Sequence, residues 1–113
     1  MTMNKRGVVA IAAGAVLMAG CTTSAAGLER GRLRMTVDSP KSPQAFATCS
    51  ADTMIGNVQL RGEGDHWWVL RFNGYGVPVT RWDFRAKPGG GTTAELRSSI
   101  PINTGDERVR NCV

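Results

Sequence analysis

The stretch His66-Trp67-Trp68-Val69-Leu70-Arg71-Phe72, followed at once by Asn73-Gly74, decides how this 113-residue chain folds. Aromatic and β-branched side chains, which favour strands, fill most of its seven positions. Asn-Gly is a strong signal for a tight turn between antiparallel strands. We therefore expect a β-hairpin, with its second strand over residues 77–86.

Further strands are expected on both sides of this hairpin. Apolar and polar residues alternate at residues 57–61, and a turn at residues 62–65 leads into the hairpin. After the hairpin, a glycine-rich turn at residues 87–91 precedes a strand at 92–100. The result is a four-stranded antiparallel meander, and the alternating residues 33–37 are a possible fifth strand.

The connection between the two hairpin strands decides which aromatic side chains share a face. A two-residue turn sends Trp82 and Phe84 to the face opposite Trp68. A three-residue loop, or a bulge at Pro78, brings them onto the face of Trp68 instead. Because proline cannot donate to the ladder, we favour the bulge.

Two helices are expected to pack on one face of this sheet. Ser42 followed by Pro43 is typical of an N-cap and first turn, which predicts a helix over residues 43–54. Near the end of the chain, Thr104 and Glu107 have the spacing of a capping box before a short helix. The predicted fold class is therefore α+β, a small antiparallel meander sheet of about four strands with two helices on one face.

The first 21 residues carry a different signal. A basic opening at Lys5 and Arg6 leads into an apolar run over residues 7–18, which ends in Met18-Ala19-Gly20-Cys21. At about 1.5 Å per residue, this run covers little more than half of a ~30 Å hydrocarbon core, which is the length of a signal-peptide apolar region. The segment resembles the bacterial lipobox, in which the cysteine becomes the lipidated first residue. Met18 stands where that family usually has leucine.

The lipobox resemblance implies three parts. They are a signal peptide at residues 1–20, a lipidated N-terminus at Cys21 with a flexible tether over residues 21–31, and a domain at residues 32–113. Thr22, rather than aspartate, follows the cysteine, which resembles lipoproteins forwarded to the outer membrane, where the domain would face the periplasm. Cleavage after Ala26, giving a soluble periplasmic protein, and an uncleaved membrane anchor are the alternatives.

Charge narrows the class of partners. The net charge of +5 falls to about +3 when Lys5 and Arg6 leave with the signal peptide. Export argues against nucleic acid as a partner. A mild affinity for anionic lipid headgroups or acidic cell-wall polymers is compatible with this charge.

Export also gives the two remaining cysteines a role. Cys49 and Cys112 each lie on the apolar side of a predicted helix and form an even pair in an oxidising compartment. A disulfide between them would close a loop of about 64 residues, worth roughly 4 kcal/mol. The alternative is a catalytic thiol at Cys49 with His66 as its base. The spacing of these two residues in the sequence does not support that alternative.

Candidate binding residues are few. Trp67, Arg81 and Arg85 form a possible contact surface, although a core tryptophan and a solvated charged strand face are the simpler interpretation. Asp65 and His66 beside Asp83 make a poor set of metal ligands. We expect no catalytic residues, no metal and no cofactor.

Three features together give the chain a family resemblance: Cys21, the run Ser42-Pro43-Gln44-Ala45-Phe46-Ala47-Thr48-Cys49, and Cys112. It resembles the short, mostly uncharacterised lipoproteins of Proteobacteria, which implies an envelope location and a disulfide-stapled α+β domain. We therefore expect a non-enzymatic structural or binding protein, held at the membrane by its lipid, with an envelope protein or cell-wall partner. The alternative is an inhibitor of a periplasmic or secreted enzyme such as a lysozyme.

Overall fold

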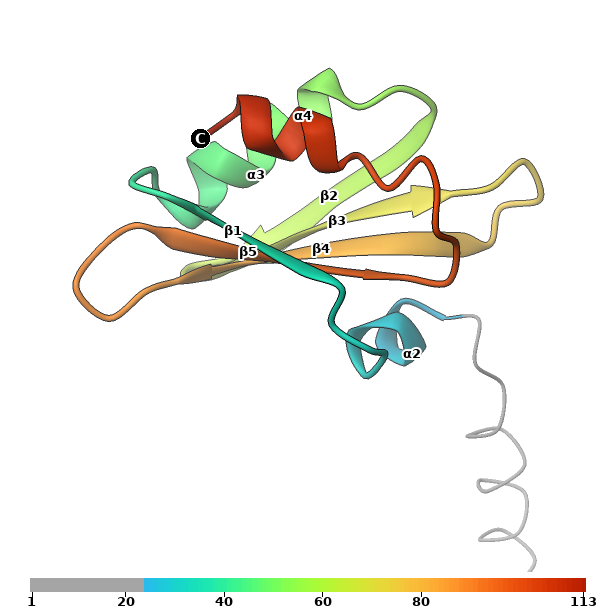
Figure 1. The fold of residues 1–113 in the computed structure, drawn as a ribbon, viewed down its shortest axis with the longest axis horizontal. Helices are drawn as coiled ribbons and strands as arrows, with labels where there is room; N and C mark the ends of the chain where they lie inside the picture. Colours follow the sequence, from blue (N-terminus) through green and yellow to red (C-terminus); the bar gives the residue numbers. More distant parts are fainter. Residues whose placement is uncertain (1–23) are drawn as a thin grey trace, which may run out of the picture.

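The computed structural model describes residues 24–113, so the predicted signal peptide and Cys21 lie outside the described residues. Within that range the chain forms one five-stranded antiparallel sheet and three helices (Figure 1). The α+β class is confirmed, with one strand and one helix more than the predicted architecture. The strands are β1 (Met35–Ser39), β2 (Asn57–Glu63), β3 (His66–Phe72), β4 (Pro78–Ala86) and β5 (Thr92–Ser98), and the helices are α2 (Ala25–Glu29), α3 (Pro43–Thr53) and α4 (Asp106–Asn111).

The strand order is β1-β5-β4-β3-β2. Strands β2 to β5 are the predicted meander, and β1 adds to its free edge as the possible fifth strand. Helices α3 and α4 cover one face of the sheet (Figure 1). On that face Phe46 meets Phe84 edge to face, at 5.0 Å between ring centres. The predicted disulfide is confirmed, since Cys49 of α3 is bonded to Cys112 at the end of α4. It ties the two helices together over the buried core.

The two predicted helix starts have different outcomes. The Ser42 hydroxyl accepts a hydrogen bond from the Ala45 amide, and Pro43 is the first residue of α3, as predicted. Helix α4 instead begins after Gly105, whose left-handed φ of 78° redirects the chain. The Thr104 hydroxyl donates to Asp106 and caps no amide, so the capping-box prediction was wrong.

The predicted faces of the hairpin were also wrong, although the bulge is present. Trp82 and Phe84 lie on the helix-covered face, opposite Trp68. The connection between β3 and β4 has five residues, and the pairing register shifts between Arg71 and Phe72. An odd-numbered loop and a bulge each exchange the two faces, so together they cancel.

Helix α2 lies within the segment predicted as a flexible tether. The tether prediction was therefore wrong for Ala25–Glu29. The Ser24 hydroxyl caps this helix by accepting from the Gly27 amide, and Leu28 is buried. The helix packs against β4 on the face opposite α3 and α4 (Figure 1). In the described residues no helix has the length and apolar character to cross a membrane.

Candidate binding site

The three predicted contact residues fall on different faces of the sheet. Trp67 packs against the core on the helix-covered face, and its Nε1 donates to the Gly64 carbonyl at 3.1 Å. Arg81 and Arg85 point from the opposite face, which we call the second face; it carries α2 and includes Trp68. Trp68, rather than Trp67, therefore accompanies the two arginines. Only the strand register distinguishes these neighbouring tryptophans, so the sequence pattern had no means of choosing between them.

Asp83 is the centre of the second face, and its side chain is fully buried. Arg81 Nε donates to Oδ1 and Oδ2 at 3.1 and 2.9 Å, and Arg81 Nη2 donates to Oδ1 at 2.8 Å. His66 Nε2 lies 2.7 Å from Oδ1, and Arg85 Nη2 lies 3.8 Å from the same oxygen. The carboxylate is thus surrounded by basic groups from two strands.

These neighbours determine the ionisation of Asp83. Burial raises the pKa of its carboxyl, but the hydrogen bonds from Arg81 and His66 oppose that effect. The positive charges of Arg81 and Arg85 also lower the pKa of Asp83, and the net result is a pKa below the ordinary value of 3.8. The carboxylate is therefore ionised at neutral pH and stabilises the buried guanidinium beside it.

Arg81 joins this carboxylate to α2. It is only 4% exposed; Nη1 donates to the Ala25 carbonyl at 3.3 Å, and Nη2 donates to a Glu29 carboxylate oxygen. The guanidinium carbon lies 5.0 Å from the centre of the Trp68 ring, at cation–π distance. Each guanidinium nitrogen has a protein partner, so Arg81 holds α2 and the indole in position and offers little to a ligand.

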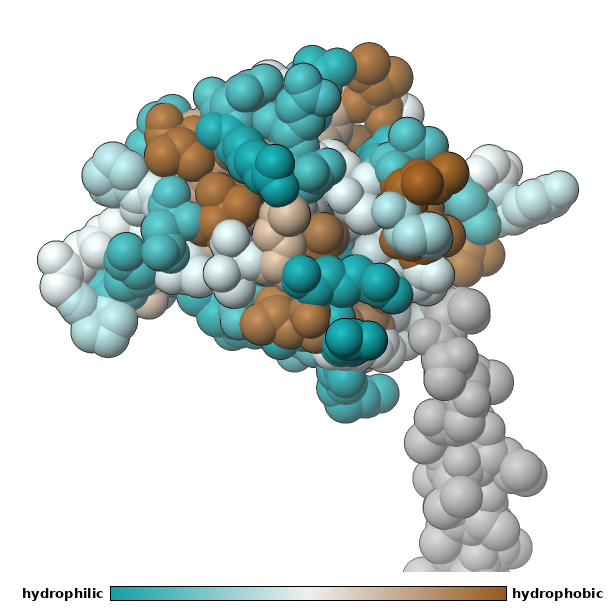
Figure 2. Space-filling view, viewed as in Figure 1, coloured by the Kyte–Doolittle hydropathy of each residue, from teal (hydrophilic) through white to brown (hydrophobic). Residues whose placement is uncertain are grey.

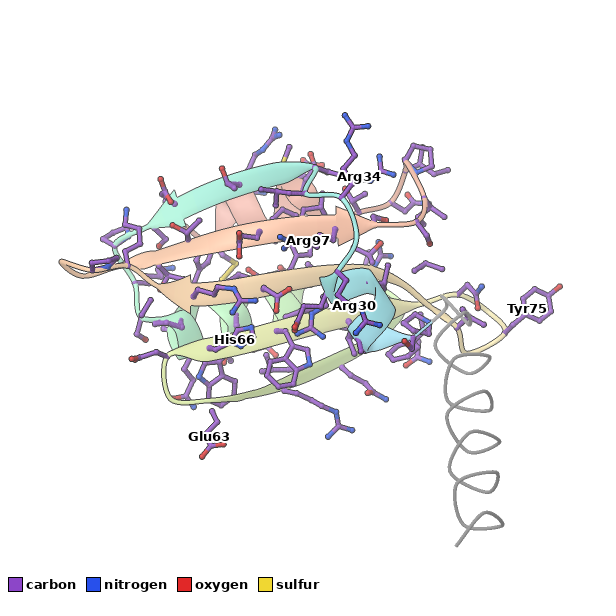
Figure 3. The ribbon with its side chains drawn as sticks, turned by 90° about the horizontal axis from the view of Figure 1, so that it is seen from below. Arg30, Arg34, Glu63, His66, Tyr75 and Arg97 are labelled. Atoms are coloured by element: carbon purple, nitrogen blue, oxygen red, sulfur yellow. A yellow bond between two sulfur atoms is a disulfide. The ribbon has the colours of Figure 1, made fainter. Side chains whose placement is uncertain are left out.

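An open groove of about 740 Å³ lies beside this cluster, between α2 and strands β2 to β4. Figure 3 looks onto this face and shows His66 on β3. The apolar lining comes from the side chains of Ala25, Ala26, Trp68, Leu70, Phe72 and Pro78. The polar lining comes from those of Gln59, Glu29, Arg61, His66, Arg81 and Arg85. An indole and two outer arginines, Arg61 and Arg85, thus share one concave surface.

Three side chains of this face have the atom types of a metal site. Atoms of Glu29, His66 and Asp83 lie within 4.8 Å of one another, whereas Asp65 is not among them. The Arg81 guanidinium lies between the two carboxylates and donates to both. Since that position already holds a positive charge, the geometry favours a structural ion-pair cluster over a metal centre.

The thiol alternative is also resolved by the fold. Cys49 is bonded to Cys112, so the hypothesis of a catalytic Cys49 thiol was wrong. His66, its supposed base, is hydrogen bonded to Asp83 on the second face, whereas Cys49 packs with the core under α3.

Comparisons with known proteins show little similarity. No family model matches the chain, and no solved structure matches it. A 58-residue stretch, half of the chain, is 36% identical to phosphoenolpyruvate carboxykinase (GTP) of Chlamydia pneumoniae. The chain spans about a tenth of that enzyme's length, so the similarity shows neither a family nor an activity.

Proposed function

We propose that this protein is an exported, non-enzymatic lipoprotein of the cell envelope that binds an anionic cell-wall polymer. In this proposal Cys21 carries the lipid, and the domain faces the periplasm from the outer membrane. The observation that carries the binding role is the second-face groove, which Trp68, Arg61 and Arg85 line together. It is a concave surface lined by both apolar and polar side chains, as ligand sites commonly are.

The groove chemistry suits a sugar polymer that bears carboxylates. An indole offers a flat apolar surface on which a sugar ring can stack. Arg61 and Arg85 supply guanidinium groups, which pair with carboxylates through two parallel hydrogen bonds. Arg85 is 45% exposed; its Nε donates to Glu95 at 3.0 Å and its Nη2 lies 3.8 Å from Asp83, so Nη1 is the guanidinium nitrogen without a protein partner among the described residues. The buried Arg81–Asp83 pair holds the indole in advance, which lowers the entropic cost of binding.

Export is supported by two independent features of the chain. The lipobox-like residues end at Cys21, and the other two cysteines form a disulfide. Disulfides persist in oxidising compartments and are rare in the bacterial cytosol. A domain that is anchored by its lipid and faces the periplasm would lie close to the cell-wall polymer.

The anchor is tested by expressing the full chain in a Gram-negative host fed an alkyne analogue of palmitate. We expect the analogue on the wild-type protein, which should sediment with membranes, and none on the Cys21→Ser variant. Mass spectrometry should show that the mature chain starts at acylated Cys21. An unmodified chain that retains Met1 would contradict the anchor.

The groove is tested by co-sedimentation of the protein with insoluble peptidoglycan. We expect the double variant Arg61→Gln/Arg85→Gln to bind at least about tenfold more weakly, since each charged hydrogen bond is worth roughly 1.5–3 kcal/mol before screening. The matched control is Arg108→Gln/Arg110→Gln on α4, which removes the same charge from the other face. Equal losses in both variants would show a diffuse charge effect and contradict the groove.

A further inference from the structure

Large apolar side chains are exposed at one end of the sheet. The exposed fractions are 42% for Leu33, 73% for Ile55, 93% for Tyr75 and 66% for Ile102. Each stands in a different connection, namely those between α2 and β1, α3 and β2, β3 and β4, and β5 and α4. These connections meet at one end, because β1, β2 and β4 begin there while β3 and β5 end there. We call these four residues and their connections the loop end.

The opposite end of the sheet is different in composition. Its connections, at residues 40–42, 64–65 and 87–91, consist of glycine, proline, serine, lysine and aspartate. Among the described residues, Val113 is the one exposed large apolar residue outside the loop end. Figure 2 shows brown residues at the right, over the loop end, while the β4–β5 connection at the left is white and teal. The apolar exposure is therefore polarised along the strands.

Positive charge lies beside these apolar residues. Arg32 and Arg34 flank the exposed Leu33 in the segment that leads from α2 into β1, and both are exposed, as is Arg30 at the start of that segment. Two exposed acids near this end, Asp52 in the last turn of α3 and Glu107 at the start of α4, form no ion pair among the described residues, whereas Asp106 lies 3.5 Å from Arg110. Exposed tyrosine and aliphatic side chains next to arginines are typical of surfaces at a membrane interface.

The chain also enters the domain at this end. Ala25 and Ala26, the first residues of α2, line the same groove as Phe72 and Pro78, which flank the β3–β4 connection. Three residues lead from Cys21 to Ser24, and at no more than about 3.6 Å each they span roughly 10 Å. The polar layer of one leaflet is itself roughly 5–8 Å thick. A lipid on Cys21 would thus hold the loop end at headgroup depth.

The geometry points to the loop end as a surface that contacts the phospholipid headgroups of the membrane. This inference rests on the proposed lipid anchor. Tyr75, Ile55 and Ile102 enter the interface, and the arginines pair with anionic headgroups. The sheet then stands with its opposite end away from the bilayer. In this orientation the second-face groove opens sideways into the periplasm rather than onto lipid.

The test uses the full lipidated protein in vesicles of phosphatidylethanolamine and phosphatidylglycerol, with one added cysteine carrying an environment-sensitive fluorophore. Gly74→Cys reports from the loop end without removing Tyr75, and nothing lies within 4 Å of a Cβ added at Gly74. Asp65→Cys, an exposed turn position at the opposite end, is the matched control. We expect bilayer-embedded quenchers to quench the Gly74→Cys probe at least about threefold more than the Asp65→Cys probe, since headgroup burial reaches only about 5–10 Å.

Intact mass of the same samples separates the two proposals. Acylated protein with equal quenching at both positions, or stronger quenching at the Asp65→Cys probe, would overturn the membrane-contacting surface alone. Protein without acyl chains would overturn the lipid anchor and, with it, this inference. In acylated protein, a drop in Gly74→Cys quenching on adding Tyr75→Ser and Ile102→Ser would support direct insertion of these side chains.

Discussion

The Arg81 guanidinium donates to both carboxylate oxygens of Asp83, two positions further along the same strand. Residues two apart on a strand share a face, so local geometry brings the pair together. Both side chains are buried, and the same guanidinium also contacts α2 and the Trp68 ring. The Arg81–Asp83 pair therefore links the sheet, helix α2 and the second-face groove.

We expect Asp83→Asn to destabilise the domain by about 3 kcal/mol or more, because it leaves the buried Arg81 charge without its counter-ion. The measurement is urea-induced unfolding at neutral pH, followed by circular dichroism. Asp38→Asn is the matched control, since Asp38 is an exposed carboxylate that contacts Thr93 and Lys87. A loss for Asp83→Asn no larger than that of the control would contradict the structural role of the pair.

The contribution of the Arg81–Asp83 pair should also appear in how the free energy of unfolding depends on pH. The pKa of Asp83 is below 3.8 in the folded protein, so the unfolded chain takes up a proton at this position first as the pH falls. The contribution of Asp83 is thus fully present above about pH 4 and is lost as the pH falls through the folded-state pKa. Unfolding free energies measured between neutral and strongly acidic pH should decline over that range. The decline should be shallower for Asp83→Asn; parallel curves would refute the assignment.

Loss of the disulfide should remove much of the domain's stability. Cys49 and Cys112 are 63 positions apart, and releasing that loop costs roughly 4 kcal/mol in the chain-entropy model. A domain of this size commonly has only about 5 kcal/mol to lose. We expect Cys49→Ala/Cys112→Ala to be partly unfolded at 37 °C by circular dichroism. A melting temperature equal to that of the wild type would show that the core is sufficient without the bond.

Two neighbouring glycines should respond differently to alanine. Both Gly90 and Gly91 have positive φ, at 107° and 80°. An added Cβ at Gly91 would lie 2.6 Å from the Ser39 carbonyl oxygen, whereas nothing lies within 4 Å of one at Gly90. Positive φ disfavours alanine at both positions, and overpacking should add at least about 1 kcal/mol to the cost of Gly91→Ala alone. Equal thermal unfolding midpoints for the two variants would contradict this close approach.

Local sequence signals predicted several elements well. The bounds of β3, the Ser42 cap with Pro43 of α3, and the Cys49–Cys112 disulfide all match the structure. Strand propensity, capping and the pairing of an even number of cysteines each depend on residues whose preferences hold before the chain is packed. The meander order followed from short connections, which join neighbouring antiparallel strands.

The sequence by itself thus determined the α+β class, the main strands and the cysteine pair, since each is set by short-range chemistry. Only the tertiary structure decided which face Trp82 and Trp68 occupy, because a loop and a bulge whose effects cancel leave no mark on the alternating pattern. It alone decided that α2 is ordered, since a five-residue helix is marginal in water until Leu28 is buried and Arg81 holds its backbone. The groove exists for the same reason: its lining comes from segments far apart in the chain that meet only when the sheet is complete.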